Sequence, residues 1–228
     1  MEAIGSYLLQ MACWLAAFWL VYILALRKET FFELNRWFLL VGIMAAFLLP
    51  LFPVRYDVIK NPTDLSLLLM TGKLSETTSA VKDPVNYWFL FYGLGAFVVF
   101  ARFLLQCIKL LWLIRKSEPV WVNNTRVFKF EGKTAPFSFF NFIFVSKTMD
   151  NEAELKTVVA HEKVHINERH WADLLLLEVA RTVQWFNPLL LLYRKAIMQN
   201  HEYLADYGTL QNGVSAQTYK AVLVNQML

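Results

Sequence analysis

The sequence has few charged residues for its length and very little cysteine. Charged residues make up 18% of its 228 positions, against about 25% in soluble domains. Its two cysteines, Cys13 and Cys107, lie within long apolar stretches and form no CxxC pair, so a disulfide framework is excluded. The 22 Lys and Arg residues are not gathered into one run, so the net charge of +4 does not indicate direct nucleic-acid binding.

Apolar residues are abundant instead, at 57% of the chain, and aromatic residues make up 16%. A soluble protein would have difficulty hiding that much apolar surface from water. Residues 3–26, 37–54 and 87–114 form three stretches that are long and apolar enough to cross a bilayer core of about 30 Å. The first stretch is too long for a cleavable signal peptide and lacks a basic leading region. The sequence therefore predicts an α-helical integral membrane protein whose first partner is the lipid bilayer.

The charges between these stretches predict their orientation. Residues 27–36 carry three basic and two acidic side chains, whereas residues 55–83 carry four of each sign. The third stretch ends at the basic pair Arg115-Lys116. Because positive charge favours the cytoplasmic side, we expect the first link and the chain after Lys116 to be cytoplasmic. The N-terminus is then expected outside.

The chain changes character after Lys116, where short segments rich in Val and aromatic residues replace the long apolar ones. Three such segments are predicted to form the strands of a small sheet: residues 119–122, 126–130 and 139–145. The sequence thus divides into a three-helix transmembrane region, residues 1–116, and a predicted cytoplasmic domain, residues 117–228.

Three helices are predicted after the sheet. Asn151, with Glu154 three residues later, resembles a capping box and marks the start of the first. The second, residues 171–185, carries three charged side chains, so we expect it to lie on the membrane surface or within the domain, without facing lipid as a span. The third is expected from Pro188 to about residue 210, with Gly208 near a frayed end.

The first of these helices carries the segment His161-Glu162-Lys163-Val164-His165. Residues four apart share one face of a helix, so His161 and His165 can direct ring nitrogens at one zinc ion. Glu162 lies one position round and can activate a water molecule without binding the metal, which makes it the candidate catalytic base. This HExxH pattern, placed on a helix directly after a strand, predicts a metallopeptidase whose strand edge binds substrate.

A catalytic zinc ion needs a third protein ligand, for which there are three candidates. His170 does not fit the HExxHxxGxxH spacing, and on a continuous helix it would lie about 140° from His165. His201 lies about 100° from Glu202 on its helix, so we do not expect both to share the metal. Glu202 is favoured, and Asp206, one turn later, can accept a hydrogen bond from a ligating histidine. On spacing alone, a solvated helix face explains Glu202 and Asp206 equally well.

The ordered set of motifs resembles the BlaR/MecR-type antirepressor membrane metallopeptidases over essentially the whole chain. The matching features are the three spans with a basic first link, Pro136-Phe137-Ser138-Phe139, His161 to His165, Asn187-Pro188, and Glu202 with Asp206. The resemblance implies a zincin-like catalytic domain, mainly α with a small sheet. It also implies a gluzincin-like Zn²⁺ site, with Glu202 as third ligand and Asp206 supporting a ligand from behind.

The resemblance further implies a regulatory endopeptidase of a bacterial inner (cytoplasmic) membrane. Its expected substrate is a cytosolic transcriptional repressor, such as a helix-turn-helix protein. Members of the family normally continue into a further span and a C-terminal domain. We therefore expect the catalytic region to be truncated at Leu228; the alternative is that its signal input is absent or supplied elsewhere. A link to β-lactams is not supported by these residues.

Two other functions are compatible with parts of the sequence. Housekeeping membrane metallopeptidases, which clear damaged proteins or trim prenylated ones, share HExxH and ExxxD; the motif at residues 136–139 and the compact three-span start favour the regulatory class. A signalling scaffold without catalysis would also keep the fold. The intact residues His161, Glu162, His165 and Glu202 argue against it, because a chain freed from catalysis need not keep all four.

Overall fold

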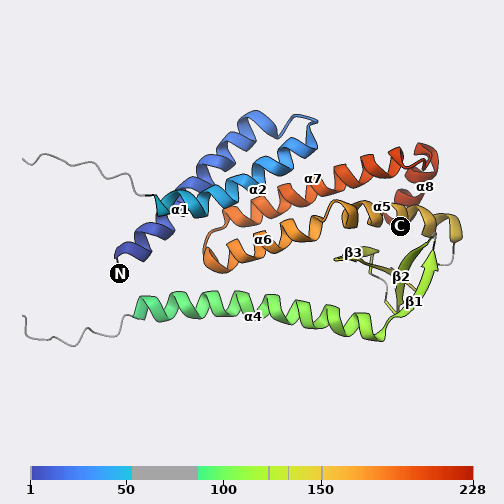
Figure 1. Ribbon diagram of the computed structural model, residues 1–228, viewed down its shortest axis with the longest axis horizontal. Helices are drawn as coiled ribbons and strands as arrows, with labels where there is room; N and C mark the ends of the chain where they lie inside the picture. The colour runs from blue at the N-terminus through green and yellow to red at the C-terminus, as the bar shows by residue number, and fades with distance from the viewer. Residues whose placement is uncertain (1, 53–86, 123, 133, 150, 228) are drawn as a thin grey trace, which may run out of the picture.

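The computed structural model describes residues 2–52, 87–122, 124–132, 134–149 and 151–227 (Figure 1). The link predicted at residues 55–83 lies outside the described residues. The elements are, in chain order, α1 (Glu2–Val21), the π-helical η1 (Tyr22–Leu26), α2 (Phe32–Leu48), the 3₁₀ turn η2 (Leu49–Leu51), α4 (Tyr87–Lys116), β1 (Glu118–Val122), β2 (Thr125–Phe130), β3 (Phe137–Phe139), β4 (Phe142–Ser146), α5 (Glu152–Asn167), α6 (His170–Val183), α7 (Leu189–Gln211) and α8 (Ala216–Met227).

Three helical segments among the described residues are long and apolar enough to cross a membrane: Ala3–Leu26, Phe32–Leu51 and Tyr87–Lys116. The first and third agree with the predicted spans to within two residues. The second begins at Phe32 rather than at residue 37, because Glu33 and Arg36 lie inside α2 although their charges indicated a link. Its predicted end at residue 54 falls outside the described residues.

The hairpin of α6 and α7 packs against α1 and α2. Buried side chains from all four helices form one apolar core, which includes Met11, Leu15, Leu39, Ile43, Leu177, Ala180, Tyr193 and Ile197. Two buried side chains also form hydrogen bonds to the backbone of α1. The Tyr193 hydroxyl donates to the Leu15 carbonyl at 3.0 Å, and the Gln184 amide donates to the Leu8 carbonyl at 2.7 Å. The predicted membrane region and the C-terminal helices therefore pack together, and the boundary at residue 116 stays a prediction.

The four strands form one mixed sheet in the order β1-β2-β4-β3. β2 and β4 are parallel, and the other pairs are antiparallel. The first two predicted strands are confirmed to within one residue. The prediction of a single strand over residues 139–145 is wrong, because the chain reverses after Phe139 and Phe140 adopts a left-handed φ of 49°. The reversal leaves the short β3 at the edge of the sheet beside α5.

The start of α5 follows the sequence prediction. The Asn151 side chain accepts hydrogen bonds from the backbone N–H groups of Ala153 and Glu154, at 3.0 Å and 3.3 Å. The predicted frayed end at Gly208 is wrong, because α7 continues to Gln211 and Gly208 lies at a close approach to α5. A Cβ atom at Gly208 would lie 2.9 Å from Cγ1 of Val164, so the glycine lets the two helices meet.

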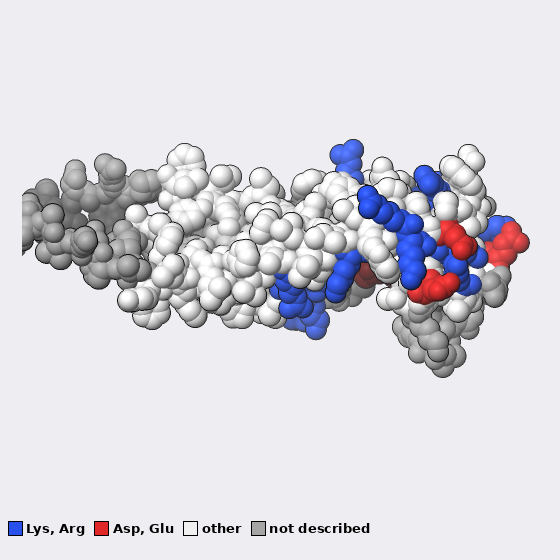
Figure 2. All heavy atoms as spheres, turned by 90° about the horizontal axis from the view of Figure 1, so that it is seen from below, with Lys and Arg blue, Asp and Glu red and all other residues white. Residues whose placement is uncertain are grey.

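Charged side chains are unevenly distributed over the surface. On the face shown in Figure 2, Lys, Arg, Asp and Glu lie from the middle of the molecule to one end, and the described surface toward the other end is uncharged. No residue of α4 is buried inside the protein, and its exposed side chains include Trp88, Phe97 and Trp112. Such an exposed apolar surface suits contact with lipid.

Candidate metal centre

Three donor groups from two helices converge on one point. α5 supplies His161 and His165, and α7 supplies Glu202, with ligand atoms all within 4.8 Å of one another. The two Nε2 atoms lie 3.2 Å apart, and the Glu202 carboxylate oxygens lie 3.5 Å from His161 Nε2 and 3.9 Å from His165 Nε2. A tetrahedral ion with bonds of about 2.0–2.1 Å holds its ligands about 3.3 Å apart. Two imidazoles and a carboxylate at these separations therefore fit one divalent metal ion.

The protonation of the two histidines is consistent with a cation site. Burial lowers the pKa of His165 to about 4, which favours the neutral imidazole that a metal requires. Burial also acts to lower the pKa of His161, but the hydrogen bond to Glu202 and the nearby carboxylates of Glu162 and Asp206 outweigh it, and the pKa is raised. The same carboxylates would stabilise a metal cation in place of that proton.

Glu162 lies beside the ligand group without belonging to it. Its side chain is buried, and this burial raises the pKa of its carboxyl, although a hydrogen bond with Ser138 and the charge of His161 oppose the shift. A raised pKa brings a carboxylate closer to the range in which it can both take and release a proton. This environment is compatible with the general-base role predicted for Glu162.

Asp206 is linked to His161 through a residue that the sequence did not indicate. The Tyr219 hydroxyl, from α8, lies 2.8 Å from His161 Nδ1 and donates to Asp206 Oδ1 at 2.6 Å. Burial and the hydrogen bond to Asp206 raise the pKa of Tyr219, so the hydroxyl keeps its proton. If His161 binds metal through Nε2, its Nδ1–H donates to Tyr219 and completes a relay to Asp206. Neither α8 nor Tyr219 had a sequence signal that placed it near the HExxH helix.

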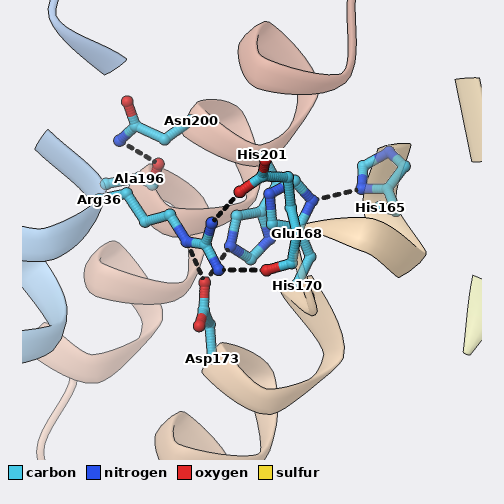
Figure 3. A network of polar contacts seen from close by, with 8 residues as sticks. All are labelled: Arg36, His165, Glu168, His170, Asp173, Ala196, Asn200 and His201. Atoms are coloured by element: carbon cyan, nitrogen blue, oxygen red, sulfur yellow. Dashed lines mark hydrogen bonds and ion pairs between the residues drawn. The ribbon is translucent and has the colours of Figure 1, made fainter. Parts of the chain in front are cut away.

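The other two histidines do not belong to the group of convergent donors, and Figure 3 shows His170 beside His165. α5 ends at Asn167, and Arg169 takes a left-handed conformation, with φ 54° and ψ 38°, before α6 begins at His170. This break, which the continuous-helix estimate did not include, turns His170 back so that its Nδ1 lies 2.8 Å from Nδ1 of His165. His201 stacks on His170 with ring centroids 3.9 Å apart and 10° between the planes.

A cavity of about 520 Å³ covers the candidate centre. His161, Glu162 and Glu202 line it together with the segment Ala135–Phe140, which includes edge strand β3. A neighbouring cavity of about 270 Å³ shares the walls Phe137, Ser138, Phe139, Trp171 and Leu174 and reaches α4. An extended peptide on the edge of β3 would therefore pass over the three donors and Glu162.

The arrangement matches the one predicted from HExxH, with a third donor group from a separate helix that could complete a metal site. The family model for BlaR1 peptidase M56 matches residues 138–224, which include β4 and both helices that carry the donors. Over these residues the match confirms the resemblance inferred from the motifs, and it supports a peptidase. No curated protein matches the chain. The roles of His161, Glu162, His165, Glu202 and Asp206 stay predictions, which the geometry now makes specific.

Proposed function

We propose that this protein is a zinc-dependent endopeptidase of a bacterial cytoplasmic membrane. Its substrate in this proposal is a cytosolic regulatory protein such as a transcriptional repressor. The observation that carries the catalytic proposal is the convergence of His161, His165 and Glu202 beside the buried Glu162, under an open strand edge. Three apolar helices support the membrane location, and the family match supports the peptidase.

In this proposal, different residues of the chain bind the metal, transfer the proton and orient a ligand. His161, His165 and Glu202 would hold the metal, which when bound would polarise the scissile carbonyl and make the attacking water more acidic. The Glu162 carboxylate accepts the proton of that water and returns it to the leaving amine. The relay of Tyr219 and Asp206 keeps the His161 ring in the tautomer that presents Nε2 to the metal.

The cavity walls predict what kind of segment is cut. Phe137, Phe139, Phe140 and Trp171 surround the path along β3, so a large apolar side chain near the scissile bond would fit best. Backbone hydrogen bonds to the edge of β3 require an extended segment. We therefore expect cleavage in an extended stretch flanked by bulky apolar residues.

Comparison of cells that express the wild-type chain with cells that express Glu162→Gln tests this function. New protein N-termini are identified by mass spectrometry in both. We expect cleavage of one or a few cytosolic regulators in wild-type cells alone. Cleavage of many damaged membrane proteins would support the housekeeping alternative, and identical sets of N-termini would reject a peptidase.

A further inference from the structure

One buried ion pair joins a candidate membrane span to the turn between the catalytic helices. Arg36, in the second turn of α2, is only 6% exposed and directs its guanidinium toward α6 (Figure 3). Its Nε donates to Asp173 Oδ2 at 2.6 Å, its Nη2 donates to the Glu168 carbonyl at 2.7 Å, and its Nη1 donates to the Glu168 carboxylate at 3.1 Å. Arg36 therefore holds a residue on each side of the break between α5 and α6.

That break decides where His170 lies. Glu168 is the C-terminal cap of α5, and Asp173 lies in the first turn of α6. His170 stands between them, so the guanidinium fixes the backbone on both sides of this ring. Charge-assisted hydrogen bonds of this kind are short and directional. A shorter or differently shaped side chain at position 36 would let the turn, and His170 with it, relax.

A second contact fixes the His170 ring itself. Asp173 Oδ2 accepts a hydrogen bond from His201 Nε2 at 2.7 Å, in addition to the one from Arg36. Its pKa is lowered because these two donors outweigh its burial, so it is ionised and can hold both. The His201 ring is stacked on His170. Arg36 thus reaches His170 by two routes, through the turn and through Asp173 and His201.

His170 in turn contacts a proposed metal ligand. His165 presents Nε2 to the other donors, so its proton belongs on Nδ1 and is donated to Nδ1 of His170. The His170 proton then lies on Nε2, which is buried and makes no hydrogen bond to any described residue. The opposite direction of donation would place a proton on His165 Nε2 and block metal binding. Only one arrangement of this pair is therefore compatible with the site.

We propose that Arg36 is a positioning residue of the metal centre, acting through His170 on His165. The inference rests on the proposed metal site but adds a role for a residue of a membrane-span helix. The positive-inside argument counted Arg36 among the three basic residues of the first link. The Arg36 side chain instead forms hydrogen bonds inside the protein, and through them the position of α2 affects the orientation of His165.

Metal binding tests this role without a known substrate. The purified full chain in detergent is titrated with Co²⁺, whose visible absorption reports ligand geometry and affinity. Arg36→Lys keeps the charge, but its single ammonium nitrogen cannot reproduce the three separate guanidinium nitrogens that make these contacts. We expect Arg36→Lys to weaken Co²⁺ binding by about 10–100-fold, as the loss of a group that orients a metal ligand does. We also expect it to change the visible absorption spectrum of bound Co²⁺. Arg181→Lys is the matched control, because it alters the Arg181–Glu178 ion pair within α6. It should change neither the Co²⁺ affinity nor the spectrum.

A double-mutant cycle separates positioning from general stability. His170→Phe keeps a ring to stack on His201 and removes the acceptor for His165. If Arg36 acts through His170, the double variant should bind Co²⁺ no more weakly than His170→Phe alone. Multiplied losses, or an unchanged affinity and spectrum in Arg36→Lys, would overturn the proposal. If Arg36→Lys does not fold, Asp173→Asn replaces it in the cycle, because it keeps the volume and removes the charged acceptor.

The same titration distinguishes the two levels of inference. Absence of Co²⁺ binding in both the wild-type chain and Arg181→Lys would reject the proposed metal centre itself. Equal binding by the wild type, Arg181→Lys and Arg36→Lys would leave the metal centre in place and reject only the role of Arg36.

Discussion

Gly208 of α7 lies against Val164 of α5, and a Cβ atom there would come within 2.9 Å of Val164 Cγ1 and 3.0 Å of Cγ2. Val164 is part of the HExxH segment, and α7 also carries Glu202. The close approach of these two residues therefore sets the distance between the two helices that supply the three donor groups. A β-branched valine has little rotamer freedom in a helix, so it offers no simple way to relieve the contact.

Gly208→Ala should accordingly push α5 and α7 apart. We expect a loss of about 1–3 kcal/mol in the free energy of unfolding, as overpacking usually causes, and weaker zinc binding. Thermal unfolding in detergent and a chelator competition measure the two effects. Gly93→Ala, where the added Cβ meets nothing within 4 Å, is the control and should preserve both properties. Equal behaviour of the two variants would show that the helix spacing tolerates a methyl group.

The second prediction separates the metal ligands from the base. His161→Ala and His165→Ala should lose bound zinc and activity together. Glu162→Gln should keep stoichiometric zinc but lose about 10²–10⁴-fold in the rate of peptide hydrolysis, because only the proton acceptor is gone. Metal analysis and cleavage of an identified substrate provide the two readings. Near wild-type turnover by Glu162→Gln would contradict the mechanism.

The third prediction concerns Glu202, which lies on a different helix from the two histidines. Glu202→Ala should strip zinc or greatly weaken its binding, since it removes one of three convergent donors. His170→Ala should still reach one zinc per chain at saturating metal, because His170 contacts only the far nitrogen of His165. Metal content of the purified variants tests both. Full zinc in Glu202→Ala with none in His170→Ala would reverse the two roles.

The fourth prediction concerns the relay behind His161. Tyr219→Phe removes only the hydroxyl that joins His161 to Asp206. We expect a loss of about 10–100-fold in zinc affinity or activity, typical for partners of metal ligands. Tyr207→Phe is the control, because Tyr207 is exposed and, among the described residues, its hydroxyl bonds only to the Gln211 side chain. An unchanged zinc affinity in Tyr219→Phe would mean that Asp206, 3.5 Å from His161 Nδ1, supports the ring directly.

The fifth prediction concerns orientation. In a background with Cys13→Ala and Cys107→Ala, single cysteines are placed at Ser75 and Asn212. A membrane-impermeant thiol reagent added to intact cells should label the first position and not the second. Labelling at Asn212 from outside would place the catalytic helices on the outer side and exclude a cytosolic substrate. The orientation was predicted partly from the charge of Arg36, which is buried in the structure. A direct test of the orientation is therefore needed.

The sequence by itself determined the features that depend on short-range periodicity and chemistry. The three apolar stretches predicted the long helices because their composition and length hardly depend on the rest of the chain. The HExxH spacing placed His161 and His165 on one face of α5, and Asn151 marked its first turn, because helix geometry and capping are local. These patterns also gave the ExxxD helix and the family resemblance.

Only the tertiary structure decided which distant groups meet. The left-handed Arg169 turned His170 back onto His165, where a continuous helix would have carried it away. The Phe140 reversal made two strands from one apolar run and left β3 at the edge. Tyr219 and Arg36 reached the site from α8 and from α2, a candidate membrane span. Tyr219 lies 58 residues after His161, and Arg36 lies 132 residues before Glu168. No local pattern encodes such contacts, because they depend on how separate helices pack against one another.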